Sequence, residues 1–152
     1  MAPVIRRARP ADAPVIAGFN IALAGETEDH VLDPAVIGPG VAAVLADPGK
    51  GLYFVAEDGG RVVGQTMVTY EWSDWRNGFL WWIQSVYVEA AARESGVFKA
   101  LHARVKEEAR KAGAVGIRLY VFDGNTRAQK VYARLGMKDG RYRVLEEMFE
   151  AH

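Results

Sequence analysis

The segment Arg93-Glu94-Ser95-Gly96-Val97-Phe98-Lys99 joins an apolar strand candidate to an amphipathic helix candidate, and this position suits anion binding. A helix N-terminus leaves backbone N–H groups without partners and carries the positive end of the helix dipole. A phosphate bound there satisfies both. Gly96 allows a close approach to the backbone, and Arg93 offers a charge-assisted contact. An ordinary strand–helix connection with a tight glycine turn explains the same residues, so both interpretations stay open here.

Several other kinds of site are excluded by what the chain lacks. No Gly-Lys-Ser/Thr follows the turn, so it is not a P-loop, and two of the three glycines of a dinucleotide fingerprint are missing. There is no cysteine, which excludes disulfides, thiolate metal sites and a cysteine nucleophile. The three histidines (His30, His102 and His152) are scattered. We therefore expect no metal.

The whole-chain composition indicates one ordinary globular domain over residues 1–152. Half of the 152 residues are hydrophobic, and 19 Lys and Arg balance 19 Asp and Glu. A net charge of zero argues against nucleic acid as the main partner. No apolar run reaches the ~20 residues of a membrane span, and the N-terminus lacks a signal-peptide core. We expect a cytoplasmic protein with no membrane partner.

Hydrophobic periodicity and turn signals predict an α+β chain with strands and helices in the order β-α-α-β-β-β-α-β-α-β. The expected strands cover residues 4–8, 52–57, 62–70, 80–88, 115–122 and 141–149. The expected helices cover residues 15–23, a stretch from 34 that Gly38-Pro39-Gly40 kinks or splits, 98–112 and 126–135. Acidic residues 26–29 are expected in a loop, and so are residues 72–78.

Two segments together resemble the GNAT superfamily of N-acetyltransferases. The run VYVEAAARESGVFKAL resembles motif A, in which a strand is followed by Arg/Gln-x-x-Gly-x-Gly/Ala at a helix start. The second segment, Asn125-x-x-Ala128-x-x-x-Tyr132-x-x-x-Gly136-Met137, is similar to the segment that follows in the family. The resemblance implies a single-domain GNAT fold, a mixed central sheet with splayed central strands flanked by helices. The WW-x-x-SVYV strand and the EWSDW loop look closest to small-amine acetyltransferases of the diamine and polyamine type.

The resemblance implies acetyl-CoA as co-substrate. Its pyrophosphate is expected on residues Arg93, Glu94, Ser95, Gly96, Val97, Phe98 and Lys99, and its pantetheine arm on the backbone of Val86 and Val88 with a contact from Asn125. The family has Gly or Ala where this chain has Phe98. Because Phe98 is in phase with Leu101 and Val105, we expect its side chain to point into the core and to leave its N–H available.

The family pattern makes Tyr132 the candidate general acid that protonates the departing CoA thiolate. Spacing alone favours a core role for Tyr132 beside Ala128 and Leu135, and a helix N-cap role for Asn125 is compatible with its contact to the arm. A general base is harder to assign, because many family members have Glu where this chain has Gln84. Gln84 is expected to position a water. The acidic candidates for the base are Glu71, Asp74, Glu26 and Glu28, and Glu71 is the preferred one.

The acceptor side is expected to attract a cation. Glu26 and Glu28 in the acidic loop favour an amine substrate by simple attraction. Trp72 and Trp75 are expected to line an acceptor pocket or to contact the amine by cation–π attraction, with packing or a dimer contact as the alternative. The ordinary alternative for Glu26 and Glu28 is that each is a solvated surface carboxylate with no part in binding.

The sequence thus favours an acetyltransferase that moves an acetyl group from acetyl-CoA to a primary amine of a small molecule, as a homodimer. Two alternatives stay open. One is a catalytically silent acyl-CoA-binding or protein-interaction domain of the same fold. The other is an acetyltransferase that acts on protein N-termini or lysines, because fold does not settle function.

Overall fold

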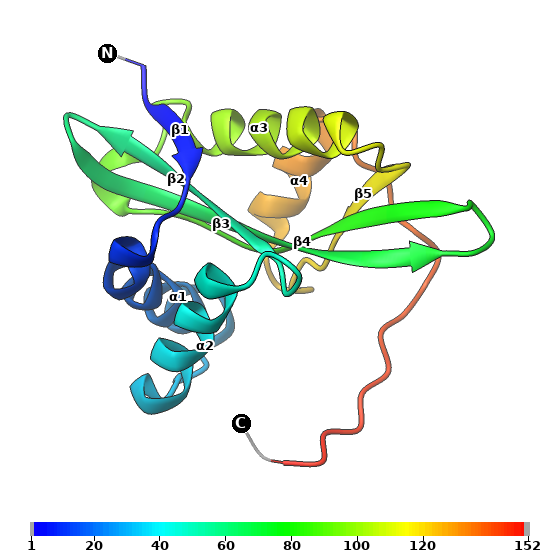
Figure 1. The fold of residues 1–152 in the computed structure, drawn as a ribbon, viewed down its shortest axis with the longest axis horizontal. Helices are drawn as coiled ribbons and strands as arrows, with labels where there is room; N and C mark the ends of the chain where they lie inside the picture. The colour runs from blue at the N-terminus through cyan, green and yellow to red at the C-terminus, as the bar shows by residue number, and fades with distance from the viewer. Residues whose placement is uncertain (1, 151–152) are drawn as a thin grey trace. The chain divides into compact units, whose positions relative to one another are not determined.

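A computed structural model describes residues 2–150. The chain divides into two compact units, Met1–Tyr120 and Val121–His152, which are described separately. The larger unit contains a five-stranded sheet with the strand order β1-β2-β3-β4-β5 (Figure 1). Its strands are β1 (Val4–Arg7), β2 (Leu52–Asp58), β3 (Arg61–Ser73), β4 (Gly78–Val88) and β5 (Gly116–Leu119). The predicted single domain over residues 1–152 stays a prediction.

The sheet is mixed. The first four strands pair antiparallel, and β4 pairs parallel with β5. The turn between β2 and β3 has positive φ at both Gly59 and Gly60, the geometry of a tight hairpin that the Asp58-Gly59-Gly60 signal predicts. The GNAT-like α+β architecture expected from the sequence is therefore present, with a parallel pair at the β5 edge.

Helices cover both faces of this sheet (Figure 1). Helices α1 (Ala13–Glu28) and α2 (Pro34–Ala46) pack on one face, where Ile16 and Val41 contact Tyr53 and Val55. Helix α3 (Val97–Lys111) packs on the other face, against residues that alternate with those along β2, such as Phe54 and Ala56. The period of two along each strand thus divides the core into two layers.

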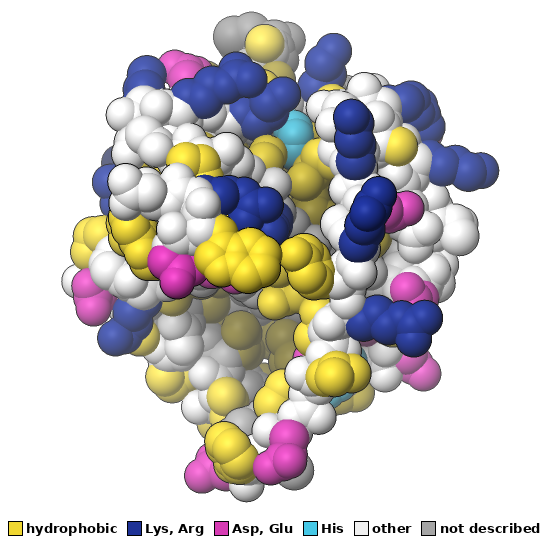
Figure 2. Space-filling model, turned by 90° about the vertical axis from the view of Figure 1, so that its right-hand side faces the viewer, with side chains coloured by type: hydrophobic (Ala, Val, Ile, Leu, Met, Phe, Trp, Pro, Cys, Tyr) yellow, Lys and Arg dark blue, Asp and Glu magenta, His cyan; other side chains and the backbone are white. Residues whose placement is uncertain are grey.

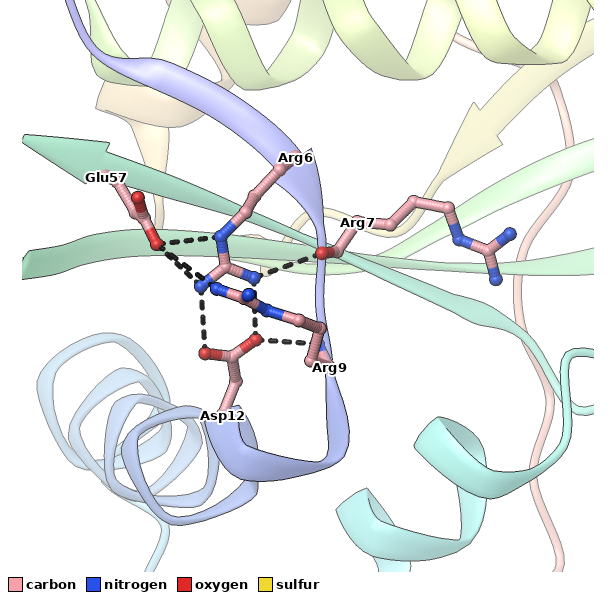
Figure 3. Close-up of polar contacts among 5 residues, drawn as sticks. All are labelled: Arg6, Arg7, Arg9, Asp12 and Glu57. Atoms are coloured by element: carbon pink, nitrogen blue, oxygen red, sulfur yellow. Dashed lines mark hydrogen bonds and ion pairs between the residues drawn. The ribbon is translucent and has the colours of Figure 1, made fainter. Parts of the chain in front are cut away.

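Four ion-pair and hydrogen-bond partners fix the start of α1 to the sheet (Figure 3). Arg6 on β1 donates from Nη1 and Nη2 to Asp12 at 2.8 and 3.0 Å, and from Nε to Glu57 on β2 at 2.7 Å. Asp12, in a short 3-10 turn (η1, Pro10–Asp12), also accepts from the Arg9 N–H at 2.6 Å. The hydrogen bonds from Arg6 lower the pKa of the Asp12 carboxyl against the opposing effect of burial.

Three predictions for the larger unit are wrong. Glu26 and Glu28 lie in the last turn of α1, which runs to residue 28, and not in a loop. Helix α2 is not split, because it runs through Pro39 to Ala46, while the predicted kink stays a prediction; residue 35, whose carbonyl the proline cannot pair with, is exposed to water. Strand β3 extends to Ser73, so Trp72 lies in a strand, paired with Phe79, and not in a loop.

The smaller unit holds helix α4 (Thr126–Arg134) and an extended segment after it. As predicted, Asn125 is the N-cap, since its Oδ1 accepts from the Ala128 N–H at 3.1 Å. The predicted strand over residues 141–149 is wrong. A strand needs a partner strand for its backbone hydrogen bonds, and residues 121–150 contain no strand.

No helix among residues 2–150 has both the length and the apolar character needed to cross a bilayer.

Candidate functional site

The parallel ladder between β4 and β5 ends early, and among residues 2–150 no strand pairs with the edge of β4 beyond it, which we call the uncovered edge. Ile83 pairs with Leu119 in the last residue pair of that ladder, while β4 continues to Val88 along β3. The register with β3 shifts immediately beyond this pair: Val68 faces Ile83, but Met67 faces Ser85. Gln84 is therefore an extra residue in β4, a β-bulge of the kind that often redirects a strand beside an active site.

One hydrogen bond, just after the end of β4, shows which way the backbone N–H and C=O groups of residues 86–88 face. Glu89 N–H donates to the Val63 oxygen on β3 at 2.9 Å. Antiparallel pairs alternate, so Tyr87 also turns its backbone groups toward β3, whereas Val86 and Val88 turn theirs toward the uncovered edge. The Val88 oxygen is indeed reached from that edge, by Arg93 Nε at 2.9 Å. Val86 and the N–H of Val88 thus present backbone groups along this edge, where the pantetheine arm is predicted to bind.

The predicted phosphate turn follows directly. After a short 3-10 turn (η2, Ala90–Ala92), Gly96 takes the N-cap position of α3 with φ of 85°, a left-handed conformation that suits glycine. Helix α3 makes its first backbone bond from Ala100 N–H to the Gly96 oxygen at 3.0 Å. The amides of residues 97–99 precede that bond, so they lie outside the ladder of the helix and face its N-terminal end.

The side chain of Phe98 behaves as the sequence predicts. It is half-buried and packs against the main core cluster, beside the buried residues Val97, Leu101 and Val105. Ser95 Oγ donates to the Ala92 oxygen, and Glu94 has φ of 67°. A bulky residue at position 98 is therefore compatible with a backbone cradle, because the ring is directed into the protein.

Arg93 holds a different position from the one expected of a phosphate ligand. Its Nη2 lies 2.7 Å from Glu26 Oε1, and Tyr87 donates its hydroxyl to Glu26 Oε2 at 2.6 Å. The Tyr87 hydrogen bond, followed by that from Arg93, lowers the pKa of Glu26. Burial, followed by the bond to Glu26, raises the pKa of Tyr87. The end of α1 and the phosphate turn are thereby joined.

Glu71, the predicted base, also has a cationic partner. Its Oε2 lies 3.0 Å from Nη1 of Arg118 on β5, whose guanidinium carbon lies 5.9 Å from the centre of the Trp82 ring. Tyr120 also packs on Trp82, with its ring centre 4.5 Å from that of Trp82. The structure therefore places Glu71 in a charged and aromatic cluster that spans β3, β4 and β5.

The remaining acceptor candidates are dispersed. Gln84 is exposed, and its Nε2 donates to Thr69 Oγ1 at 2.8 Å. Glu28 is exposed at the end of α1. Trp72 is half-exposed and stacks edge-to-face on Phe79, with ring centres 5.0 Å apart. Figure 2 views the molecule from the side of the β3–β4 turn and shows hydrophobic side chains exposed on this face.

In the smaller unit, burial raises the pKa of Tyr132 to about 12. Its phenol therefore stays protonated at neutral pH, as a general acid must. Asn125 and Tyr132 lie at opposite ends of the same short helix, α4 and its cap.

Sequence reasoning missed two residues that contact the predicted ones, Tyr87 and Arg118. Both lie on strands whose registers decide which side chains meet, and a single sequence carries no signal of that register. Within residues 2–150, no group of three or more His, Cys, Asp or Glu side chains is placed to hold a metal ion.

Comparisons with known proteins agree with this fold. The model of the acetyltransferase (GNAT) family matches residues 25–137. A possible acetyltransferase from Clostridium difficile 630 is 43% identical, with a TM-score of 0.91 over 99% of this chain and 100% of that one. An aminoglycoside N-acetyltransferase in complex with CoA is 19% identical, with a TM-score of 0.79 over 97% of this chain and 95% of that one, and shows the fold alone.

A curated relative is more specific but is matched over part of its length. Thialysine N-epsilon-acetyltransferase from Bos taurus is 30% identical over 99 residues, which are 65% of this chain and 54% of the relative. The match thus spans about half of that protein. Family membership rests on the family model and on the full-length structural relative: this chain belongs to the GNAT family, whose members are acetyl-CoA-dependent N-acetyltransferases.

Proposed function

We propose that the protein transfers the acetyl group of acetyl-CoA to a primary amine of a small molecule, by direct attack of the amine on the thioester. One observation carries this proposal. Within a single unit, the β4 edge left uncovered after Ile83 leads directly into the amides at the start of α3. A ligand with a peptide-like arm and a pyrophosphate, as acetyl-CoA has, matches that sequence of backbone donors and acceptors.

The cofactor residues follow from this arrangement. Backbone groups of Val86 and the Val88 N–H pair with the pantetheine arm, and the amides from Ser95 to Lys99 bind the pyrophosphate. A β4 N–H also stabilises the charge that develops on the thioester oxygen, a kind of contact that contributes roughly 3 kcal/mol in other enzymes. Asn125 is proposed to contact the arm in addition to capping α4.

Tyr132 is the proposed general acid. A phenol with a pKa of about 12 holds its proton at neutral pH, so it is available as a proton donor. The thiolate that leaves when the amine displaces CoA is proposed to accept this proton as the C–S bond breaks. Proton transfer from Tyr132 then prevents the thiolate from attacking the new amide.

The acceptor is proposed to be a cationic amine that carboxylates attract. Glu26, Glu28 and Glu71 supply negative charge, and Gln84 and Trp72 provide a polar and an aromatic contact. Glu71 is proposed as the base that removes a proton from the ammonium group, through a water if the distance requires one. The thialysine acetyltransferase relative supports a lysine-like amine, since thialysine carries a primary amine on a flexible chain.

A two-step experiment tests this function. Acetyl-CoA at ~100 times its Kd should stabilise the protein by roughly 2.7 kcal/mol, measured by thermal unfolding. Release of free CoA thiol is then followed with thialysine, lysine, diamines, polyamines and N-terminal peptides as acceptors. The proposal is supported if one class of small amines has a higher kcat/KM than the other amines and the peptides of the panel. Binding without turnover would favour the silent acyl-CoA-binding alternative, and a preference for peptides would favour the protein-modifying one.

The homodimer and the cytoplasmic location expected from the sequence stay predictions. Sedimentation of the purified protein measures the first, and fractionation of the cells that express it measures the second.

A further inference from the structure

The Glu26 carboxylate at the end of α1, which is proposed to attract the acceptor, contacts the predicted phosphate turn before α3. Both of its oxygens are used: Oε2 accepts from the Tyr87 hydroxyl at 2.6 Å, and Oε1 pairs with Arg93 Nη2 at 2.7 Å. Three segments meet there, the end of α1, the end of β4 and the turn before α3, and Glu26 on the first lies 61 and 67 residues before Tyr87 and Arg93 on the other two.

The two halves of this contact differ in how firmly they are held. Tyr87 is 9% exposed, and its ring packs on Phe19 with 5.3 Å between the ring centres. The ion pair is open to water, since the side chains of Arg93 and Glu26 are 41% and 45% exposed. An exposed ion pair contributes little to stability, so the Glu26–Arg93 link is the weaker half.

Arg93 is held by two contacts that do not involve Glu26. Nε is bonded to the Val88 oxygen at 2.9 Å, and the guanidinium carbon lies 5.5 Å from the centre of the Tyr87 ring. These two contacts hold the base of the guanidinium, while Nη2 faces Glu26. A pyrophosphate offers more negative charge than one carboxylate and accepts two parallel N–H bonds from a guanidinium.

We propose that the pyrophosphate of acetyl-CoA and the Glu26 carboxylate compete for Arg93, so that cofactor binding releases Glu26 to attract the acceptor amine. This inference rests on the proposed function. When Arg93 turns to the pyrophosphate, Glu26 Oε2 keeps its hydrogen bond from Tyr87. Glu26 Oε1 loses its cationic partner and can bind another cation. The released carboxylate then attracts a cationic acceptor, and by reciprocity the acceptor strengthens cofactor binding.

The competition has a distinctive signature in ligand binding. Glu26→Gln removes the competitor, so CoA should bind about two- to fivefold more tightly, as the small free energy of an exposed ion pair implies. Pantetheine lacks the pyrophosphate, and its affinity should not change. Glu107→Gln is the matched control, because Glu107 forms an exposed ion pair with Lys111 on α3. This control should bind both ligands as the wild type does.

A double-mutant cycle separates competition from a simple loss of negative charge. In the Arg93→Gln background, Glu26→Gln should no longer tighten CoA binding, because there is no guanidinium to release. Calorimetry gives the CoA affinities, and displacement of CoA gives those of pantetheine, whose binding also reports an intact fold.

The outcomes distinguish this inference from the function on which it rests. If the wild type binds CoA, the inference is overturned by a Glu26→Gln affinity that is unchanged or weaker. It is also overturned if Glu26→Gln still tightens CoA binding in the Arg93→Gln background, or if Glu26→Gln changes the affinity for pantetheine as much as that for CoA. If the wild type binds no CoA, the proposed function itself fails.

Discussion

The backbone oxygen of Val88 accepts a hydrogen bond from Arg93 Nε at 2.9 Å, and this bond marks one end of the uncovered β4 edge. The Ile83–Leu119 pair marks the other end. Five residue steps of about 3.3 Å separate Ile83 from Val88, so the edge is roughly 16 Å long. An extended arm with two amide groups can pair along such an edge and reach the amides of α3 with its phosphates.

The first prediction concerns the Val86 N–H. Val86→Pro removes this N–H on the side that faces away from β3, so the β3–β4 ladder keeps its bonds. We expect CoA binding to weaken about three- to tenfold, the value of one hydrogen bond. Calorimetry measures the affinity, and thermal unfolding reports the fold.

The matched control for this change is the next residue. Tyr87→Pro removes an N–H that faces β3, so it should lower the unfolding temperature much more than Val86→Pro does. A folded Val86→Pro variant with the CoA affinity of the wild type would contradict the role assigned to this edge.

The second prediction concerns Tyr132. Tyr132→Phe removes the proposed acid, so kcat should fall about 100-fold or more, while the Kd for acetyl-CoA should change little. Because the pKa of Tyr132 is raised to about 12, its acidic form persists across the working range. The wild-type kcat should therefore rise with pH as the acceptor loses its proton, and should not fall again below pH ~10.

Tyr142→Phe serves as the control for this substitution, since Tyr142 is 79% exposed. Its kcat should equal that of the wild type. An unchanged kcat in Tyr132→Phe would remove the assignment of the acid.

The third prediction separates acceptor binding from cofactor binding at Glu71. Glu71→Gln removes the carboxylate that Arg118 holds at 3.0 Å. We expect kcat/KM for the amine to fall about tenfold or more, with an unchanged affinity for CoA, because the carboxylate acts on the ammonium alone. Steady-state kinetics with the best amine measures this. Equal losses for amine and CoA would instead indicate a structural role for the Glu71–Arg118 pair.

The fourth prediction concerns stability in acid. The pKa of Asp12 is lowered in the folded state by its bonds from Arg6. This contribution to stability is therefore present above the unfolded pKa of about 3.9 and is lost as pH falls through the lower folded value. Asp12→Asn should cost about 2 kcal/mol at pH 7, a typical value for a hydrogen bond to a charged group.

Urea unfolding at pH 7 and at pH 3 measures this effect. The difference in stability between Asp12→Asn and the wild type should shrink at the lower pH. The control is Asp58→Asn, at an exposed carboxylate beside the β2–β3 turn, which should alter stability little at either pH. A penalty for Asp12→Asn that stays equal at both pH values would contradict the linkage.

Local signals predicted much of the fold. Asp58-Gly59-Gly60 predicted the hairpin because only a few residues take positive φ readily, and the N-cap at Asn125 followed from the same kind of chemistry. The phase of Phe98 with Leu101 correctly placed its ring against the core. These predictions succeeded because residues close in the sequence determine a turn, an N-cap and the face of a helix.

Predictions that depended on distant residues were less successful. Nothing within residues 26–29 shows that Tyr87 and Arg93 meet Glu26, or that α1 continues to that point. Nothing near Glu71 shows that Arg118 is its partner, since β5 must first pair with β4. The strand expected at 141–149 has the composition of a strand but finds no strand to pair with in its own unit.

The most direct test of the proposed chemistry is the stoichiometry of acetyl transfer. Acetyl-CoA is incubated with the best small amine of the panel, free thiol is measured, and the N-acetylated amine is quantified by mass spectrometry. One acetylated amine for each thiol released, with both lost in Tyr132→Phe, is the result predicted here. Thiol release without an acetylated amine, or tight CoA binding with no turnover for any amine, would contradict the central claim.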